Sequence, residues 1–189
     1  MRSTRQRPTA SMPRAQARSG HTTARSGRPS LRLVLQTGSG VTAPPASRAQ
    51  LRRWVLAALS RDAALTLRFV ARSEARALNA GYRSRDYAPD VLTFVYDAPP
   101  PPSNTPTRSL PERLHADIVL CVPVLREQAR AARIPLEWRL AHLVVHGVLH
   151  AQGHDHEQDD DAQRMQALES SVLQRFRIPD PYADDPGLS

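Results

Sequence analysis

The feature that most constrains this chain is an eleven-residue stretch, 146 to 156, that reads HGVLHAQGHDH. On a helix, His146 and His150 are four residues apart and project from the same face. Gly153 can end that helix by adopting a positive φ, so the chain turns back and brings His156 toward the other two rings. The stretch therefore predicts a helix followed by a tight turn, with three imidazoles converging on one point.

Converging imidazoles are a typical metal site. Three neutral ring nitrogens suit Zn²⁺ and leave one coordination position for water, whose pKa the ion can lower to about 7. Nickel, copper or iron would also accept these ligands. A lone histidine on an apolar helix is more often a packed core residue, but this spacing of three around a glycine favours ligands. We predict one Zn²⁺ per chain, bound by His146, His150 and His156.

Two further histidines lie close to this motif. His142 precedes His146 by one helical turn on the same face, and His154 lies in the turn itself. Either could add a fourth ligand. We expect His142 to be packed or to support the ligands through hydrogen bonds, and His154 to be exposed.

The same ligand spacing occurs in metzincin proteases, which place a glutamate directly after the first histidine as general base. Here that position is Gly147. A peptidase without its base would be badly handicapped. Asp155 and Glu157 could substitute, although neighbours of a ligand more often support it or face solvent. A metzincin-like metalloprotease is therefore an alternative that this missing carboxylate disfavours.

Hydrophobic periodicity predicts an α/β (α+β) fold, a mixed four-stranded sheet packed against several helices, with the zinc site at the end of a central helix. Alternating or β-branched apolar runs predict four strands, near 31–35, 64–70, 91–96 and 116–122. Apolar stripes and capping residues predict five helices, beginning after Ser47 and near Ser73, and then over 123–133, 136–152 and 159–177. Four consecutive prolines place an irregular loop between Ala98 and Pro111.

Composition changes sharply along the chain. Residues 1–30 contain seven arginines, no acidic residue and no Leu, Ile, Val, Phe, Tyr or Trp, so we expect a disordered arginine-rich extension. Residues 31–182 should form a single domain, and 183–189 a flexible tail. Cys121 is the only cysteine, which excludes an intrachain disulfide and cysteine-rich zinc modules. Because no apolar run approaches the ~20 residues that span a bilayer, we expect a soluble, cytoplasmic protein.

The formal charge of +8 is unevenly distributed. Residues 31–150 carry 16 arginines against nine acidic residues, whereas 151–189 carry three arginines against nine. A basic central body can attract a phosphate backbone, while the acidic end cannot. Every one of the 26 cationic residues is arginine, which is also typical of a GC-rich genome.

Four segments together resemble the YbeY family of bacterial rRNA-maturation endoribonucleases, over about residues 73–178. They are the histidine stretch HGVLHAQGHDH, AHLVV (141–145), LNAGYRSRDYAPDVLTF (78–94) and ADIVLC (116–121). The histidine stretch is highly specific and the others are supportive. Departures from the family pattern are His154 in place of tyrosine, Ala116 in place of glycine, and Asp90 and Thr93 in place of Asn and Ser. None removes a metal ligand.

The resemblance implies a zinc-dependent, single-strand-specific endoribonuclease, a hydrolase of phosphodiester bonds that acts in 16S rRNA 3′-end maturation and ribosome quality control. His146, His150 and His156 would bind the metal, and Arg83 would line a positively charged channel and serve as the catalytic cation. Expected partners are single-stranded RNA, the 16S rRNA precursor, the small ribosomal subunit and its assembly factors, with no DNA and no membrane. A non-catalytic ribosome assembly factor is a second alternative.

Overall fold

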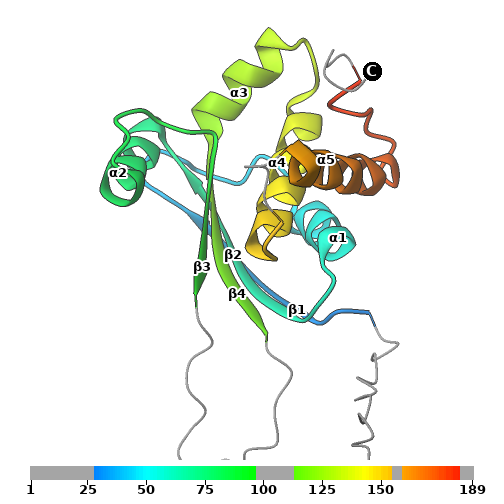
Figure 1. The fold of residues 1–189 in the computed structure, drawn as a ribbon. Helices are drawn as coiled ribbons and strands as arrows, with labels where there is room; N and C mark the ends of the chain where they lie inside the picture. The colour runs from blue at the N-terminus through cyan, green and yellow to red at the C-terminus, as the bar shows by residue number, and fades with distance from the viewer. Residues whose placement is uncertain (1–27, 97–112, 155–158, 184–189) are drawn as a thin grey trace, which may run out of the picture.

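A computed structural model describes residues 28–96, 113–154 and 159–183 of the chain. It contains four strands and five helices within these residues, in the predicted order (Figure 1). They are β1 (Leu31–Thr37), α1 (Arg48–Ala58), β2 (Ala63–Val70), α2 (Arg72–Arg83), β3 (Val91–Tyr96), β4 (Leu114–Cys121), α3 (Val122–Ala131), α4 (Leu136–Ala151) and α5 (Asp159–Gln174). Most of the predicted extension, proline loop and tail lies outside the described residues, as do Asp155, His156 and Glu157.

The four strands form one mixed sheet in the order β1-β2-β4-β3. β1 and β4 both run parallel to β2, and β3 pairs antiparallel with β4 at the edge of the sheet. The predicted α/β class and mixed four-stranded sheet are therefore confirmed. β3 faces the part of the molecule where the histidine helix ends, which makes this edge one wall of the candidate site.

The alternating pattern of the two central strands separates two cores. Leu65, Leu67 and Phe69 on β2 and Ile118 on β4 enter the larger core, which α1, α4 and α5 cover on one face of the sheet (Figure 1). Side chains that point to the other face form a smaller core beneath α2, which includes Val119. Burial on both faces explains why β4 reads as a continuous apolar run in the sequence.

Helix α4 is the central helix of the larger layer. Ten of its residues are buried, and it contacts α1, α3, α5, β3 and β4. A helix that is apolar nearly all round is stable only when other elements enclose it. Its polar side chains at His146 and His150 therefore emerge into a site bounded by neighbouring elements rather than onto an open surface.

Two helix starts test the predicted caps. Ser47 caps α1 with a full capping box, in which its hydroxyl accepts from the amide of Gln50 and the Gln50 side chain accepts from the amide of Ser47. The predicted cap at Ser73 is wrong, because the chain turns from β2 directly into α2 and Ala71 is the N-cap, without a side-chain hydrogen bond. The helix predicted from residue 136 does begin there, as α4, with Pro135 as its N-cap.

No helix among the described residues combines the length and apolar character that crossing a bilayer requires.

Candidate metal centre and active site

His146 and His150 lie on one face of α4 near its C-terminal end. Their ring centroids are 4.5 Å apart and the ring planes are inclined at 78°. Both side chains are partly buried, so each is shielded from bulk water without being closed off. The third predicted ligand, His156, lies outside the described residues.

The turn after α4 has the geometry that its sequence predicts. Gly153 has a φ of +90°, which confirms the positive φ expected at this position. Its amide donates to the His150 carbonyl at 2.9 Å, and the His154 amide donates to the Leu149 carbonyl at 3.1 Å. This pair of bonds is a Schellman motif, which caps the helix and reverses the chain direction. His154 itself is partly buried, whereas we expected it to be exposed.

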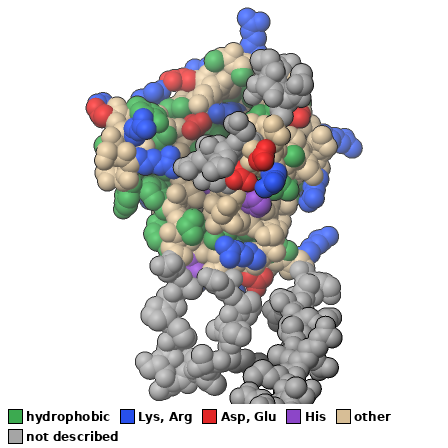
Figure 2. Space-filling view, viewed as in Figure 1, with side chains coloured by type: hydrophobic (Ala, Val, Ile, Leu, Met, Phe, Trp, Pro, Cys, Tyr) green, Lys and Arg blue, Asp and Glu red, His purple; other side chains and the backbone are tan. Residues whose placement is uncertain are grey.

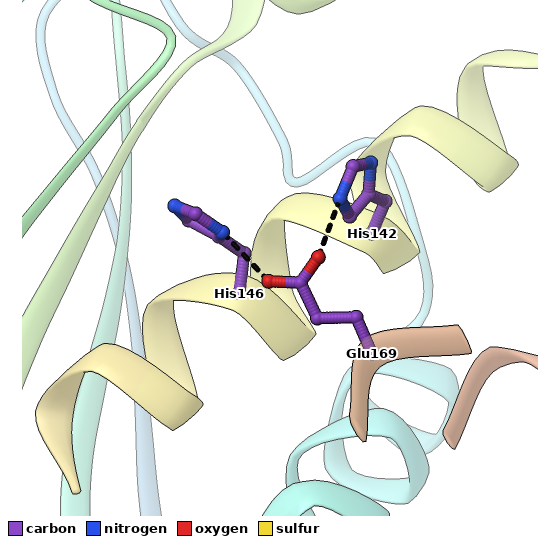
Figure 3. A group of neighbouring side chains, drawn as sticks. All are labelled: His142, His146 and Glu169. Carbon is purple, nitrogen blue, oxygen red and sulfur yellow. Dashed lines mark hydrogen bonds and ion pairs between the residues drawn. The ribbon is translucent and has the colours of Figure 1, made fainter. Parts of the chain in front are cut away.

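A buried carboxylate on α5 joins two histidines of α4. Glu169 is only 1% exposed, and its two oxygens lie 2.9 Å from Nε2 of His142 and 2.7 Å from Nδ1 of His146. Figure 3 shows this carboxylate between the two rings, with the other nitrogen of His146 pointing away from it. The hydroxyl of Tyr182 donates to the same oxygen that faces His142.

Glu169 is held ionised by these donors. Burial alone would raise its pKa, but hydrogen bonds from His142, His146 and Tyr182 outweigh that penalty and hold the pKa at about 2. Burial and the adjacent Glu169 carboxylate raise the pKa of Tyr182, so its hydroxyl remains a donor. The cluster is thus one negative charge buried among three hydrogen-bond donors.

The hydrogen bonds continue from His142 to the wall of a cavity. Nη1 of Arg139 lies 3.3 Å from Nδ1 of His142, and Nη2 of Arg139 donates to Asp90 at 3.0 Å. A guanidinium has no acceptor, so Nδ1 of His142 accepts and its neutral ring carries the proton on Nε2. His142, expected to be packed or to support the ligands, is buried. It belongs to a hydrogen-bond network that runs from Asp90 through Arg139 and His142 to Glu169 and His146.

Three of these residues can offer metal ligands at once. One ligand atom each from His142, His146 and Glu169 lies within 4.8 Å of the others, so this cluster is a possible metal site. His146 is common to this cluster and to the predicted triad of His146, His150 and His156. The two arrangements differ in which nitrogen of His146 faces the ion, because Nδ1 faces Glu169.

A cavity of about 740 Å³ opens beside the two ring faces. His146 and His150 line it from α4, Arg83 from the last residue of α2, and Asp90 and Thr93 from the loop and strand that follow. Arg83 is exposed and stands at the same cavity as the two histidines, although 63 residues separate it from His146 in sequence. The cavity is large enough for part of a polymer to enter.

Gly147 lies where the histidine helix meets the sheet. A Cβ added there would come within 2.8 Å of Cγ2 of Ile118 and 3.3 Å of Oγ1 of Thr93. This position is buried against β3 and β4, so a glutamate side chain there would force Ile118 to shift. Helix packing therefore disfavours the base that a metzincin places next to its first ligand.

Sequence patterns did not identify Glu169, yet a signal was present. The buried side chains of α5 follow helical spacing at Met165, Glu169, Val172 and Leu173. A carboxylate on the apolar stripe of a helix requires a partner, since burying an unpaired charge is costly. Glu169 lies 23 residues after His146 on another helix, so only the folded arrangement brings the two together.

Comparisons with known proteins place the chain in a family. The family model described as "Endoribonuclease YbeY" matches residues 45–177. The chain is 48% identical to the endoribonuclease YbeY of Thiobacillus denitrificans over 82% of its own length and 97% of that protein. It is also 48% identical to the endoribonuclease YbeY of Cupriavidus pinatubonensis, covering 83% and 74% of the two chains, and 44% identical to that of Methylibium petroleiphilum, covering 84% and 99%.

The family match contains both histidines of α4, Arg83, Glu169 and the cavity walls. Relatives of this identity, matched over most of both chains, share fold and chemistry, and the name of the family describes hydrolysis of RNA phosphodiester bonds. The protein belongs to the YbeY family of endoribonucleases.

Proposed function

We propose that this enzyme is a zinc-dependent endoribonuclease specific for single-stranded RNA, acting in the cytoplasm on the 16S rRNA 3′ end and in ribosome quality control. His146, His150 and His156 would hold one Zn²⁺, and Arg83 would bind the scissile phosphate. The precursor rRNA, the small ribosomal subunit and its assembly factors would be its partners. The observation that carries the proposal is the Glu169–His146 hydrogen bond beside a cavity that Arg83 and His150 share.

The donor set fits a zinc ion. A ring that donates from Nδ1 to a carboxylate carries its lone pair on Nε2, and a carboxylate behind a ligating histidine is the usual support of a zinc site. Glu169 meets that description for His146, and the ring of His150 lies beside it. The bound ion would supply Lewis acidity toward the phosphate and lower the pKa of an attacking water.

The hydrogen-bond pattern favours this triad over the cluster of His142, His146 and Glu169. Arg139 can only donate to Nδ1 of His142, so Nε2 of that ring carries a proton and donates to Glu169. A protonated nitrogen has no lone pair for a metal. His142 is therefore better suited to orient Glu169, which in turn holds the proton on Nδ1 of His146.

The cavity walls suit an anionic substrate. Arg83 offers several fixed donors to phosphate oxygens and can neutralise charge that develops during cleavage. Asp90 is the acidic residue among the described lining side chains, and its charge is compensated by the ion pair with Arg139. One of its oxygens also accepts from Gln128 at 3.1 Å, so the carboxylate is not directed at the substrate.

Metal content separates the two ligand sets. We expect His150→Ala to lose stoichiometric zinc, and His142→Gln, which keeps a donor toward Glu169, to retain it, as measured by elemental analysis of the purified proteins. Retention of zinc by His150→Ala together with its loss in His142→Gln would instead support the cluster with Glu169.

Cleavage assays test the activity itself. Labelled single-stranded RNA, the same RNA in a duplex, and casein are each incubated with the enzyme, with and without a chelator. We expect cleavage of the single strand alone, its loss with chelator and its recovery when zinc is added back. Cleavage of casein would revive the protease alternative, which Gly147 and the family match oppose.

A further inference from the structure

Exposed aromatic side chains gather beside the candidate active site. The large apolar side chains with the highest exposure in the described part of the chain are Tyr82 (72%), Tyr87 (57%), Val95 (56%) and Tyr96 (51%). Figure 2 shows hydrophobic side chains grouped over α2 and β3, whereas elsewhere on this face they are scattered. We call Tyr82, Tyr87 and Tyr96 the aromatic surface. A concentration of exposed rings on one side of a protein marks an interaction site.

The aromatic surface is continuous with the cavity that contains the two histidines. Tyr87 and Val95 line that cavity directly. Tyr82 immediately precedes Arg83, which lines it from the end of α2. Tyr82 and Tyr96 lie on the α2 side of β3, with Phe94, whereas Thr93 and Val95 point to the cavity on the other side. A strand of RNA that crosses the edge at β3 can therefore contact both the exposed rings and the cavity.

Two of the rings are held in place while their outer faces stay accessible. Tyr82 packs edge-on against Phe94 of β3, with ring centroids 4.8 Å apart. The hydroxyl of Tyr96 donates to Asp117 on the neighbouring strand at 3.1 Å. A ring fixed along one edge loses little conformational freedom when a planar ligand stacks on it, which favours binding.

The surrounding charge suits a nucleic acid better than a protein partner. Arg83 and Arg85 flank the rings, and neither forms an ion pair within the described residues. Of the nearby acidic side chains, Asp86 is bound to Arg76 through two hydrogen bonds of 2.6 Å, and Asp117 accepts the hydroxyl of Tyr96. Aromatic faces interleaved with unpaired guanidinium groups are the usual surface for unpaired bases and their phosphates.

We propose that the aromatic surface binds unpaired nucleobases of the RNA by stacking, chiefly on Tyr82 and Tyr87, and so selects single strands at the cavity entrance. The inference rests on the proposed function, because it assumes that RNA enters this cavity. Bases in a duplex are already stacked on each other and cannot reach the rings. Selection for a single strand then arises at the approach to the site, separately from the hydrolysis of the phosphodiester bond.

The test uses the full-length, zinc-loaded protein and an unstructured RNA that carries 2-aminopurine, a base whose fluorescence is quenched by stacking. We expect the wild-type protein to quench the probe, and the double variant Tyr82→Ala/Tyr87→Ala to quench it weakly and bind roughly 10-fold or more less tightly. Tyr82→Phe/Tyr87→Phe should restore both properties. Leu168→Ala, which removes an exposed apolar side chain on α5, is the matched control and should behave as wild type.

A second substrate separates stacking from a general loss of structure. RNA with abasic positions keeps its phosphates but offers no rings, so wild type and the alanine variant should bind it equally weakly. The proposal is overturned if the alanine variant binds and quenches like wild type, or if its affinity for abasic RNA falls as much as for intact RNA. Quenching is read without cleavage, so a wild-type protein that stacks the probe but cuts no RNA would refute the proposed function and leave this inference standing.

Discussion

Arg83 ends α2 and exposes its guanidinium at the rim of the cavity. We predict that Arg83→Glu folds normally but cleaves single-stranded RNA with a kcat/KM lowered roughly 10- to 100-fold, the usual cost of losing a hydrogen bond to a charged group. Normal folding is expected because the residue is exposed and forms no ion pair among the described residues. Steady-state cleavage rates and far-UV circular dichroism provide the two readouts.

Charge reversal also alters the field around the cavity, so the variant needs a matched partner. Arg130 is another exposed arginine near a helix C-terminus, on α3, and it does not line the cavity. Arg130→Glu should leave kcat/KM within about twofold of wild type, because an exposed charge that does not line the cavity is largely screened by salt. Equal losses in the two variants would mean that net charge, rather than contact with the phosphate, sets the rate.

Glu169 accepts a hydrogen bond from Nδ1 of His146 and so orients this ring. Glu169→Gln keeps the shape of the side chain but loses its charge, and we predict a zinc affinity lowered roughly 10- to 100-fold, as is typical for the partner of a ligating histidine. Competition with a chelating dye measures the affinity. Ser170→Ala is the control, because its hydroxyl bonds to Asp180 and not to the histidines. A Glu169→Gln protein with unchanged zinc affinity would argue against a supporting role.

At the level of single residues, sequence patterns identified those whose chemistry is encoded by local spacing. His146 and His150 are one helical turn apart, and the turn at Gly153 follows directly. Glu169 is a different case, since its role depends on α5 packing across α4, a contact between segments 23 residues apart. The position of Arg83 at the cavity came from family resemblance rather than from any physical property of its sequence neighbourhood.

Among the elements, the contact of α4 with the sheet depends on Gly147. We predict that Gly147→Ala lowers the free energy of unfolding by about 1–2 kcal/mol, because the added methyl group must displace the fully buried Ile118. The better helix propensity of alanine offsets part of this cost, by about 0.5–1 kcal/mol. Chemical denaturation measures the difference.

Gly81 provides the opposite case on α2. A Cβ at this exposed helical position meets nothing within 4 Å, so Gly81→Ala should raise the free energy of unfolding. The expected gain is about 0.5–1 kcal/mol, from helix propensity alone. If Gly147→Ala raises the free energy of unfolding as Gly81→Ala does, the close approach of α4 to β4 does not restrict the side chain at position 147.

The starts of the helices show where local sequence patterns stop predicting the structure. The capping box at Ser47 is encoded within four residues and was predicted correctly. The start of α2 was not, because Ser73 has the side chain of a cap but β2 continues to Val70 and forces the helix to begin immediately. Sheet pairing thus overrides a local capping preference.

For the whole molecule, the order of elements could be predicted, but the order of strands could not. Alternation and apolar runs locate β1 to β4 in the sequence, yet nothing local places β4 between β2 and β3 or reverses β3. Strand pairing follows from contacts between distant segments, such as Leu67 with Ile118. That order gives the site its wall, because β3 is the edge strand that lies next to α4.

The relation between metal and overall stability follows from the same architecture. The larger core is formed by apolar side chains of the sheet, α1, α4 and α5, none of which needs an ion to pack. We therefore predict that zinc removal leaves the secondary structure intact but lowers Tm. At a zinc concentration of 100 times its Kd, binding stabilises the folded state by about 2.7 kcal/mol. For a chain of this size, that corresponds to about 5–10 °C in Tm.

Circular dichroism and scanning calorimetry, with and without chelator, measure these two effects. His150→Ala is the control, since a protein that no longer binds zinc should show the same Tm in both conditions. Complete unfolding on chelation would assign the ion a structural role and favour the non-catalytic alternative. A zinc-depleted protein with unchanged Tm would mean that the ligands do not hold the ion in the folded state. The predicted result, a lower Tm with intact secondary structure, fits an ion that binds to a preformed site.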